Sequence, residues 1–370
     1  MGISETYARG RRMLGTSPGT VVLAVIVAVL LLDLGRQLLV GDQQFFRLGV
    51  LIKDGLMRGL VIGLAGIGLS MTYSILNFAN FAHGDYITAG GFAGWATTYA
   101  IAGGLGARAD IGSLLLVGAG GSVFGGALGI GIVTTPLAVI LGLVVAGAFT
   151  IGLSLFVDRY AFKPLRDRSG ISLIITSIGV AFAIRFTIQF VFDPSRRGLT
   201  ATQPSVAIPF IDGTVQVGAH DVTLTVVAVA LMLGVHFLLQ RTKLGKAMRA
   251  MADNEDLARI TGIPTEQVVR YTWIIGSGLT GLGGFMFFLW KGTMGYFDGW
   301  LLLLLIFAAV ILGGIGSIYG AILGGLVIGI TASVSVVWIP ADFSRAAAFF
   351  VMIVILLVKP QGLFSGRSTA

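Results

Sequence analysis

Residues 77–85 read Asn-Phe-Ala-Asn-Phe-Ala-His-Gly-Asp and separate two apolar blocks, residues 55–76 and 86–102. Apolar blocks of this length on both sides of a short polar stretch are typical of α-helices that cross a membrane. The stretch itself brings two amides, an imidazole and a carboxylate together. A polar group inside hydrocarbon costs several kcal/mol unless it is paired, so such a cluster marks a substrate path or a special backbone turn. A short solvated turn between two helices is the simpler alternative.

The composition extends this interpretation to the whole chain. Of the 370 residues, 55% are hydrophobic and 11% are charged, and the mean hydropathy is +0.93. Soluble domains carry about 25% charged residues, so these charges are too few to cover a globular protein of this size. We predict one all-α, polytopic transmembrane domain over residues 1–370. The absence of cysteine excludes thiol catalysis and disulfides, and with three scattered histidines we expect no metal site and no cofactor bound by this chain.

Ten blocks are long enough to cross about 30 Å of hydrocarbon. An eleventh apolar stretch, residues 111–132, is rich in glycine, and we interpret it as re-entrant or as lying on the outer face. The ten predicted crossings are residues 20–40, 55–76, 86–102, 136–157, 171–192, 222–239, 269–290, 301–318, 321–339 and 343–358.

Basic residues in two loops predict the orientation. The loop after residue 157 and the loop after residue 239 are both rich in Lys and Arg, which the positive-inside rule places in the cytoplasm. Both termini then also lie inside. The net charge of +8 follows from these loops and does not indicate nucleic-acid binding. Counting residues 111–132 as a crossing would break this agreement. Three cations contradict the rule, because they fall outside: Arg47, Lys53 and Arg58.

Two connections are long enough to carry structure of their own. Residues 193–221 form the predicted extracytoplasmic loop, where three prolines and alternating valines indicate turns and a short hairpin. Residues 241–268 form the predicted cytoplasmic loop, with an amphipathic helix over residues 243–260 that ends at Gly262-Ile263-Pro264. Its acidic residues would repel anionic lipid headgroups, which favours docking to a protein.

Glycine spacings indicate where helices pack closely. Residues 276–281 match GxGxxG but lie inside an apolar run of helix length, so they indicate helix packing rather than a dinucleotide site. No P-loop motif is present, so the chain does not itself bind ATP in that way. Pairs spaced as GxxxG predict close helix approaches, namely Gly59 with Gly63, Gly316 with Gly320, and Gly325 with Gly329.

Arg185 is the one basic residue well inside a predicted crossing. We expect it to snorkel to the outer interface. The alternative is that it faces the bundle and pairs with a carboxylate of the substrate or of Asp193. Asp33 and Arg36 are expected to form a local pair.

Four islands of sequence resemble the permeases of branched-chain amino acid ABC transporters. They occur in the family's order along the chain, although residues 103–134 look like an insertion. The islands are Asn77-Phe78 with Phe81-Ala82-His83-Gly84-Asp85, the run Arg241-Thr242-Lys243-Leu244-Gly245-Lys246-Ala247-Met248-Arg249-Ala250, the glycine-rich residues 312–325, and Lys359-Pro360-Gln361-Gly362-Leu363-Phe364.

The resemblance implies a multi-pass permease subunit of an ATP-driven importer in a prokaryotic inner membrane, which carries branched-chain or related amino acids and is not an enzyme. Cytoplasmic ATP-binding subunits would hydrolyse ATP and push on the coupling loop. A second permease subunit, identical or related, and an extracytoplasmic substrate-binding protein would complete the importer. The residues implied for the coupling loop are Gly245, Arg249, Asp253, Ala258, Gly262 and Pro264. Those proposed for the substrate path are Asn77, Asn80, His83, Asp85 and Arg185.

Three alternatives remain open. A permease for urea or short amides would share similar signatures. In an ion-coupled secondary carrier, Asp85 and Arg185 would bind the coupling ion and the substrate. A membrane-embedded enzyme would need catalytic groups, and the only adjacent pair available is His83 with Asp85. In the importer, we expect that pair to fix the backbone around Gly84.

Overall fold

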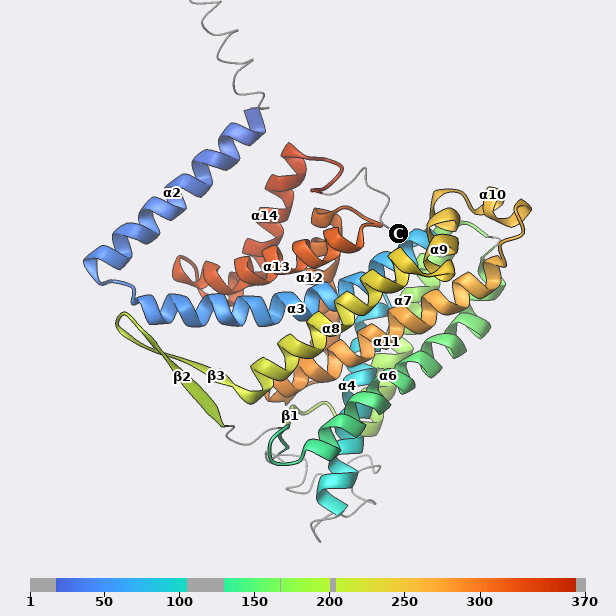
Figure 1. Ribbon diagram of the computed structural model, residues 1–370, viewed down its shortest axis with the longest axis horizontal. Coiled ribbons are helices and arrows are strands. Elements are labelled where there is room, and N and C mark those ends of the chain that lie inside the picture. The colour runs from blue at the N-terminus through green and yellow to red at the C-terminus, as the bar shows by residue number, and fades with distance from the viewer. Residues whose placement is uncertain (1–17, 105–129, 167, 200–203, 364–370) are drawn as a thin grey trace, which may run out of the picture.

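The computed structural model describes residues 18–104, 130–166, 168–199 and 204–363. These residues form a bundle of α-helices with two small antiparallel sheets at one side (Figure 1), which confirms the predicted all-α membrane fold. The helices are α2 (Pro18–Val40), α3 (Phe45–Leu76), α4 (His83–Gly104), α6 (Pro136–Val157), α7 (Gly170–Phe192), α8 (Ala219–Arg241), α9 (Lys243–Asp253), α10 (Glu255–Ile260), α11 (Thr265–Lys291), α12 (Asp298–Gly313), α13 (Ile318–Val334) and α14 (Ser344–Val358). The strands are β1 (Arg197–Gly198), β2 (Ser205–Phe210), β3 (Gly213–Gly218) and β4 (Thr293–Met294).

Each predicted crossing corresponds to a helix, although most boundaries are shifted by a few residues. The largest shifts are at the start of α3, at the end of α12 and at the end of α13, which lies at Val334 rather than at residue 339. Helix α3 begins at Phe45 rather than at residue 55, because its charged residues continue the helix instead of preceding it. The eighth crossing ends at Gly313 rather than at residue 318. Gly314 and Gly316 have φ angles of 102° and 87° there, which reverse the chain where a side chain would be strained.

Seven of the described helices are long and apolar enough to cross a membrane, namely α3, α6, α7, α8, α11, α13 and α14, and α12 is shorter. Helices α2 and α4 coincide with predicted crossings without belonging to these seven. The count of ten crossings therefore stays a prediction. Most of the predicted re-entrant segment, residues 111–132, lies outside the described residues.

Helices α3 and α13 meet along a seam of glycines. A Cβ atom added to Gly329 would lie 2.5 Å from Cα of Gly59, and one added to Gly325 would lie 2.7 Å from Cα of Gly63. The backbones therefore touch, which small residues permit. This confirms two of the predicted GxxxG pairs as helix contacts. The third, at Gly320, is part of the tight α12–α13 turn.

The GxGxxG stretch is confirmed as helix packing. It lies within α11, where Gly276 faces Gly68 of α3 and Gly281 faces Ala146 of α6. Helices α3 and α11 are consequently the most buried of the membrane-length helices in the described part of the chain, since 83% of the most apolar window of each is buried.

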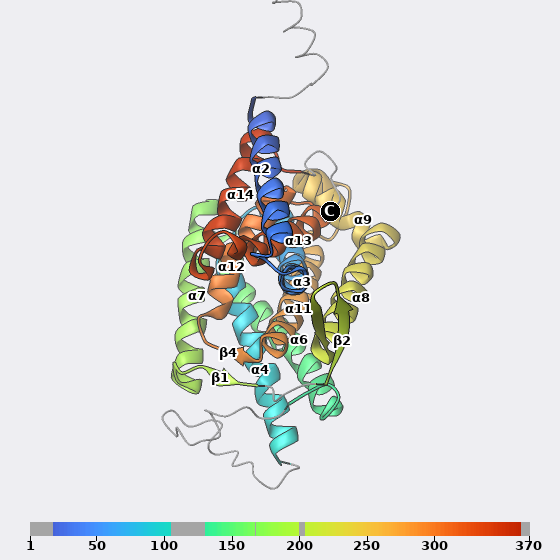
Figure 2. The same cartoon turned by 90° about the vertical axis from the view of Figure 1, so that its left-hand side faces the viewer.

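Two elements lie at the margin of the bundle (Figures 1 and 2). Helix α2 is tied to the bundle through Asp33, which accepts a hydrogen bond of 2.9 Å from Nε1 of Trp338 and also pairs with Arg36 as predicted. Strands β2 and β3 form the predicted hairpin. The hairpin docks on the start of α3, where Asp212 accepts from the backbone N–H groups of Phe45 and Phe46 at 2.6 and 2.7 Å.

The connections define two sides of the molecule. Helices α8 and α11 are joined through α9 and α10, so their other ends, at the hairpin and at Lys291, lie on the opposite side (Figure 1). Both loops predicted to be cytoplasmic lie on the α9–α10 side. Glu266, at the start of α11, pairs with Lys163 at 2.9 Å and with Arg166 at 3.0 Å from the other loop. We call the hairpin side the outer side below.

Candidate functional site

The polar stretch between α3 and α4 forms a tight, mostly buried turn. Asn77 is exposed and ends α3 with φ 52°, and its N–H donates to the carbonyl of Tyr73 at 2.8 Å. Asparagine is among the few residues that adopt this left-handed conformation readily. Asn80 is fully buried, and its side-chain oxygen accepts from the N–H of Ala82 at 3.0 Å. Its Nδ2 has no hydrogen-bond partner among the described residues.

His83 joins three helices. Its Nε2 lies 2.9 Å from the carbonyl oxygen of Ala65 in α3 and 3.3 Å from Oγ1 of Thr280 in α11. A carbonyl only accepts hydrogen bonds, so Nε2 carries the proton. The predicted pairing of His83 with Asp85 is wrong, because on a helix residues two apart point to different faces.

Asp85 pairs instead with Arg185 of α7. Nε of Arg185 donates to Oδ1 of Asp85 at 2.9 Å, and Nη2 donates to Oδ2 at 2.8 Å. The carboxylate is 0% exposed and the guanidinium side chain 4%. The guanidinium carbon also lies 4.5 Å from the ring centre of Trp300 and 5.0 Å from that of Phe297, which adds cation–π attraction.

This pair corrects the expectation for Arg185. The side chain does not snorkel to an interface, and its partner is neither Asp193 nor a free site but the carboxylate of Asp85. In this bidentate geometry, the two buried charges neutralise each other and each carboxylate oxygen accepts a hydrogen bond. Four of the five residues proposed for the path are thus buried, and three of these, His83, Asp85 and Arg185, make contacts between helices. Their place on a substrate path stays a prediction.

The loop predicted to be cytoplasmic consists of two helices rather than one. Asn254 is extended, with φ −161° and ψ 106°, and its side chain accepts from the N–H of Leu257 at 2.8 Å. Asparagine is a preferred N-cap residue, so it ends α9 and begins α10. The predicted continuous helix over residues 243–260 is therefore wrong at this point.

The residues implied in coupling fix these two helices to their neighbours. A Cβ atom on Gly245 would lie 2.2 Å from the carbonyl oxygen of Leu239 at the end of α8, so α9 packs directly on that end. Nη1 of Arg249 donates to the same carbonyl. Asp253 is exposed and is the last residue of α9.

Helix α10 ends in a Schellman turn, as the predicted stop at Gly262 requires. Gly262 has φ 84°, its N–H donates to the carbonyl of Arg259, and the N–H of Ile263 donates to that of Ala258 at 3.0 Å. Ala258 is buried at 2% exposure, and Pro264 is the N-cap of α11. The apolar face that was predicted for one continuous helix is therefore divided between α9 and α10.

The division leaves an apolar surface on α10. Met248 and Met251 of α9 are 2% and 4% exposed, whereas Leu257 and Ile260 of α10 are 55% and 81% exposed. Met248 and Met251 thus pack inside the protein, and Leu257 and Ile260 face outward.

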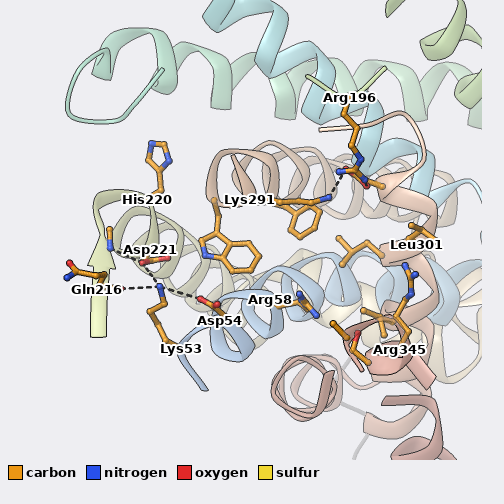
Figure 3. A pocket seen from close by; sticks show the side chains of 18 of the residues that line it. Lys53, Asp54, Arg58, Arg196, Gln216, His220, Asp221, Lys291, Leu301 and Arg345 are labelled. Atoms are coloured by element: carbon orange, nitrogen blue, oxygen red, sulfur yellow. Dashed lines mark hydrogen bonds and ion pairs between the residues drawn. The ribbon is translucent and has the colours of Figure 1, made fainter. Parts of the chain in front are cut away.

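A cavity of about 830 Å³ lies on the outer side, between α3, α8, the hairpin and the starts of α12 and α14 (Figure 3). Nine charged side chains line it, five basic and four acidic. Most of them neutralise one another. Lys53 bonds to Asp221 at 3.2 Å, and Asp298 accepts from both Arg196 and Lys291, at 2.6 and 2.9 Å.

The residues of this cavity were not predicted as a site, although the sequence contained a signal for it. Lys53 and Arg58 were two of the three cations that contradicted the positive-inside rule, and both line the cavity. Cations retained on the outer side against that rule mark either a paired residue or a binding site. Lys53 is of the first kind, because it is bonded to Asp221.

A family model and several relatives match most of this sequence. The family model described as "Branched-chain amino acid transport system / permease component" matches residues 51–357. The chain is 28% identical over 333 residues to the high-affinity branched-chain amino acid transport system permease protein LivH of Escherichia coli, covering 87% of this chain and 97% of the relative. It is 24% identical over 315 residues to the corresponding protein BraD of Pseudomonas aeruginosa, covering 84% and 94%.

An archaeal relative and one solved structure extend the comparison. The probable branched-chain amino acid transport permease protein LivH of Methanocaldococcus jannaschii is 27% identical over 350 residues, covering 91% of this chain and 95% of the relative. The solved structure of PsaBC from Streptococcus pneumoniae in complex with Fab is 14% identical, covers 88% of this chain and 94% of its own, and gives a TM-score of 0.40. Since the family model spans most of the sequence, this chain belongs to the branched-chain amino acid transport system permease family.

Proposed function

We propose that this chain is the membrane-spanning permease subunit of an ATP-driven importer in a prokaryotic inner membrane, and that it carries branched-chain amino acids. Membership of the family and the names of its relatives support the substrate class. The proposed partners are cytoplasmic ATP-binding subunits, a second permease subunit and an extracytoplasmic binding protein. ATP is bound and hydrolysed by the partners, and both termini lie in the cytoplasm.

The apolar surface of α10 is the observation that carries this proposal. Leu257 and Ile260 are exposed on a short helix that also bears Glu255 and Asp256. Apolar side chains that stay exposed at such a position mark a contact surface. The adjacent carboxylates disfavour an anionic lipid surface, so a protein is the better partner. An ATP-binding subunit placed there would cover Leu257 and Ile260.

The loop is built to transmit a push. Helix α9 is fixed to the end of α8 through Gly245 and Arg249, and only four residues separate α10 from α11. A displacement of α10 therefore moves the cytoplasmic ends of both helices. Helix α11 packs on α3, α4 and α6, so the displacement reaches the centre of the bundle.

The ion-coupled carrier finds less support. In that alternative Asp85 would exchange a proton or a cation in each cycle. Both of its oxygens are occupied by the Arg185 guanidinium, and the residue is fully buried. A structural role for Asp85 fits this geometry better.

Paired charge substitutions test the docking. Ile260→Glu should prevent co-purification of the ATP-binding subunits and abolish ATP-driven leucine uptake into proteoliposomes, because it buries a charge in the contact. Ile211→Glu is the matched control, because Ile211 is 79% exposed on the outer side, against 81% for Ile260. It should leave co-purification unchanged. Wild-type association by the Ile260 variant, or uptake by the chain alone driven by a sodium or proton gradient, would contradict the proposal.

A further inference from the structure

Two cations of the outer cavity have no hydrogen-bond or ion-pair partner among the described residues. Arg58 of α3 and Arg345 of α14 both line the cavity, and neither makes a hydrogen bond or an ion pair with any residue that the structure describes. Figure 3 shows the two side chains reaching the same end of the cavity near Leu301, and no dashed line meets either guanidinium. Guanidinium groups bind carboxylates through bidentate hydrogen bonds.

Arg58 lies further along α3 than the paired Lys53. It is five positions from Lys53, which is about 7.5 Å at the rise of an α-helix. It is half-buried and has one acidic residue nearby on the same helix, Asp54. Asp54 already lies 3.3 Å from Nζ of Lys53. A cation in this position gains by binding a mobile anion.

The remaining features of the cavity complement the other parts of an amino acid. Asp342, two residues before α14, is exposed and makes no hydrogen bond or ion pair among the described residues. It is suited to an ammonium group. Leu301, Leu302 and Leu305 of α12 supply an aliphatic wall. The volume of about 830 Å³ falls within the roughly 300–1,000 Å³ of ligand pockets in proteins.

We infer that the outer cavity is a binding site for a zwitterionic aliphatic amino acid, with its carboxylate on Arg58 and Arg345 and its side chain against the α12 leucines. This inference rests on the proposed function and adds to it a place within the permease. Because the cavity lies on the side opposite to α9 and α10, the site would be the first that a substrate meets on entry. Selectivity would then reside partly in this chain.

The absence of cysteine makes a direct test possible. In the full-length chain, purified in nanodiscs, Leu301→Cys supplies the only thiol. Its rate of reaction with a water-soluble methanethiosulfonate reagent is measured with increasing L-leucine, with leucinamide, which lacks the carboxylate, and with urea. We expect L-leucine alone to slow the reaction.

Arginine variants identify the carboxylate partner. Adding Arg58→Gln should raise the half-protecting leucine concentration about tenfold to hundredfold, the range for a lost hydrogen bond to a charged group. Arg58→Lys keeps the charge and should have a smaller effect. Arg47→Gln is the matched control, since it removes the same charge from the same helix outside the cavity, and it should leave protection unchanged.

The outcomes separate this inference from the proposed function. Three results would overturn the site. The first is that leucine and leucinamide protect the thiol at position 301 equally, and the second is that Arg58→Gln leaves this protection unchanged. The third is that anionic phospholipid in the nanodisc protects the thiol and leucine does not. ATP-driven leucine uptake that survives Arg58→Gln at wild-type affinity would also overturn the site and leave the proposed function intact. Leucine protection in a chain whose assembled importer shows no uptake would contradict the function and support the site.

Discussion

Removing one partner of the buried pair of Asp85 and Arg185 should strongly destabilise the protein. Asp85→Asn keeps the shape of the side chain but removes the charge that balances Arg185. The guanidinium then stays buried at 4% exposure with one neutral partner. Removing one member of a buried pair typically costs about 3–5 kcal/mol, because the other charge is left uncompensated. We expect a loss of that size in the free energy of unfolding.

A double-mutant cycle shows whether the loss arises from the unpaired charge. Arg185→Met alone should cost a similar amount, because it leaves the carboxylate of Asp85 alone. The double variant buries no charge. It loses the contact with Trp300, worth about 0.5–2 kcal/mol, and leaves an amide with fewer partners, at about 1–3 kcal/mol. The double variant should therefore lose clearly less than the sum of the two single losses.

Unfolding in mixed detergent and dodecyl sulfate micelles, followed by tryptophan fluorescence, measures these differences. The matched control is Arg259→Ala, which breaks an exposed pair with Glu255 whose side chains are 62% and 42% accessible. An exposed pair of this spacing contributes only about 0.3–0.5 kcal/mol. An Asp85→Asn variant within about 1 kcal/mol of the wild type, or strictly additive single losses, would refute the reasoning.

Two further predictions concern glycines. Gly329→Ala places a methyl group 2.5 Å from the backbone of Gly59 and should destabilise the protein by about 1–3 kcal/mol in the same unfolding assay. Gly234→Ala is the control, because it has open space around it and should not destabilise the protein. Equal stability of the two variants would contradict close packing between α3 and α13. Gly245→Val should lower the yield of folded chain in size-exclusion chromatography, because its side chain would overlap the end of α8. Gly262→Ala has free space but a φ of 84° and should cost only about 1 kcal/mol, so a greater loss of folded chain from Gly262→Ala than from Gly245→Val would contradict this ranking.

The helices were predictable because each depends on the apolar sequence of its own segment. The helix α6, for example, spans the predicted residues 136–157, since uninterrupted apolar sequence both defines a crossing and sets its length. The start of α3 was missed because Arg47 and Lys53 looked like the end of a loop. The helix starts at Phe45 because Asp212 of the hairpin accepts from its first N–H groups. Gln216 and Asp221 provide partners for Lys53. Those partners lie far along the chain.

The contacts of the polar residues were not predictable from the sequence. Arg185 lies within the helix predicted for it, but a sequence does not say which face of a helix meets which neighbour. Its partner Asp85 lies 100 residues away. Asn254 is different, because an asparagine inside an amphipathic helix is a local signal for an N-cap, and it was available in the sequence.

The glycine seam between α3 and α13 limits how the protein can change shape. Where backbones touch, neither helix can approach further, and a roll of one residue about either axis would turn a larger side chain into the contact. The two helices therefore behave as one rigid unit. Helix α7 is held differently, since its main contacts among the described elements are with α4 and with the segment Asp158–Phe162. The pair of Asp85 and Arg185 joins α7 to α4 through side chains and not through touching backbones. Alternation between inward- and outward-open shapes would then hinge at the margin of the bundle, around a stiff centre.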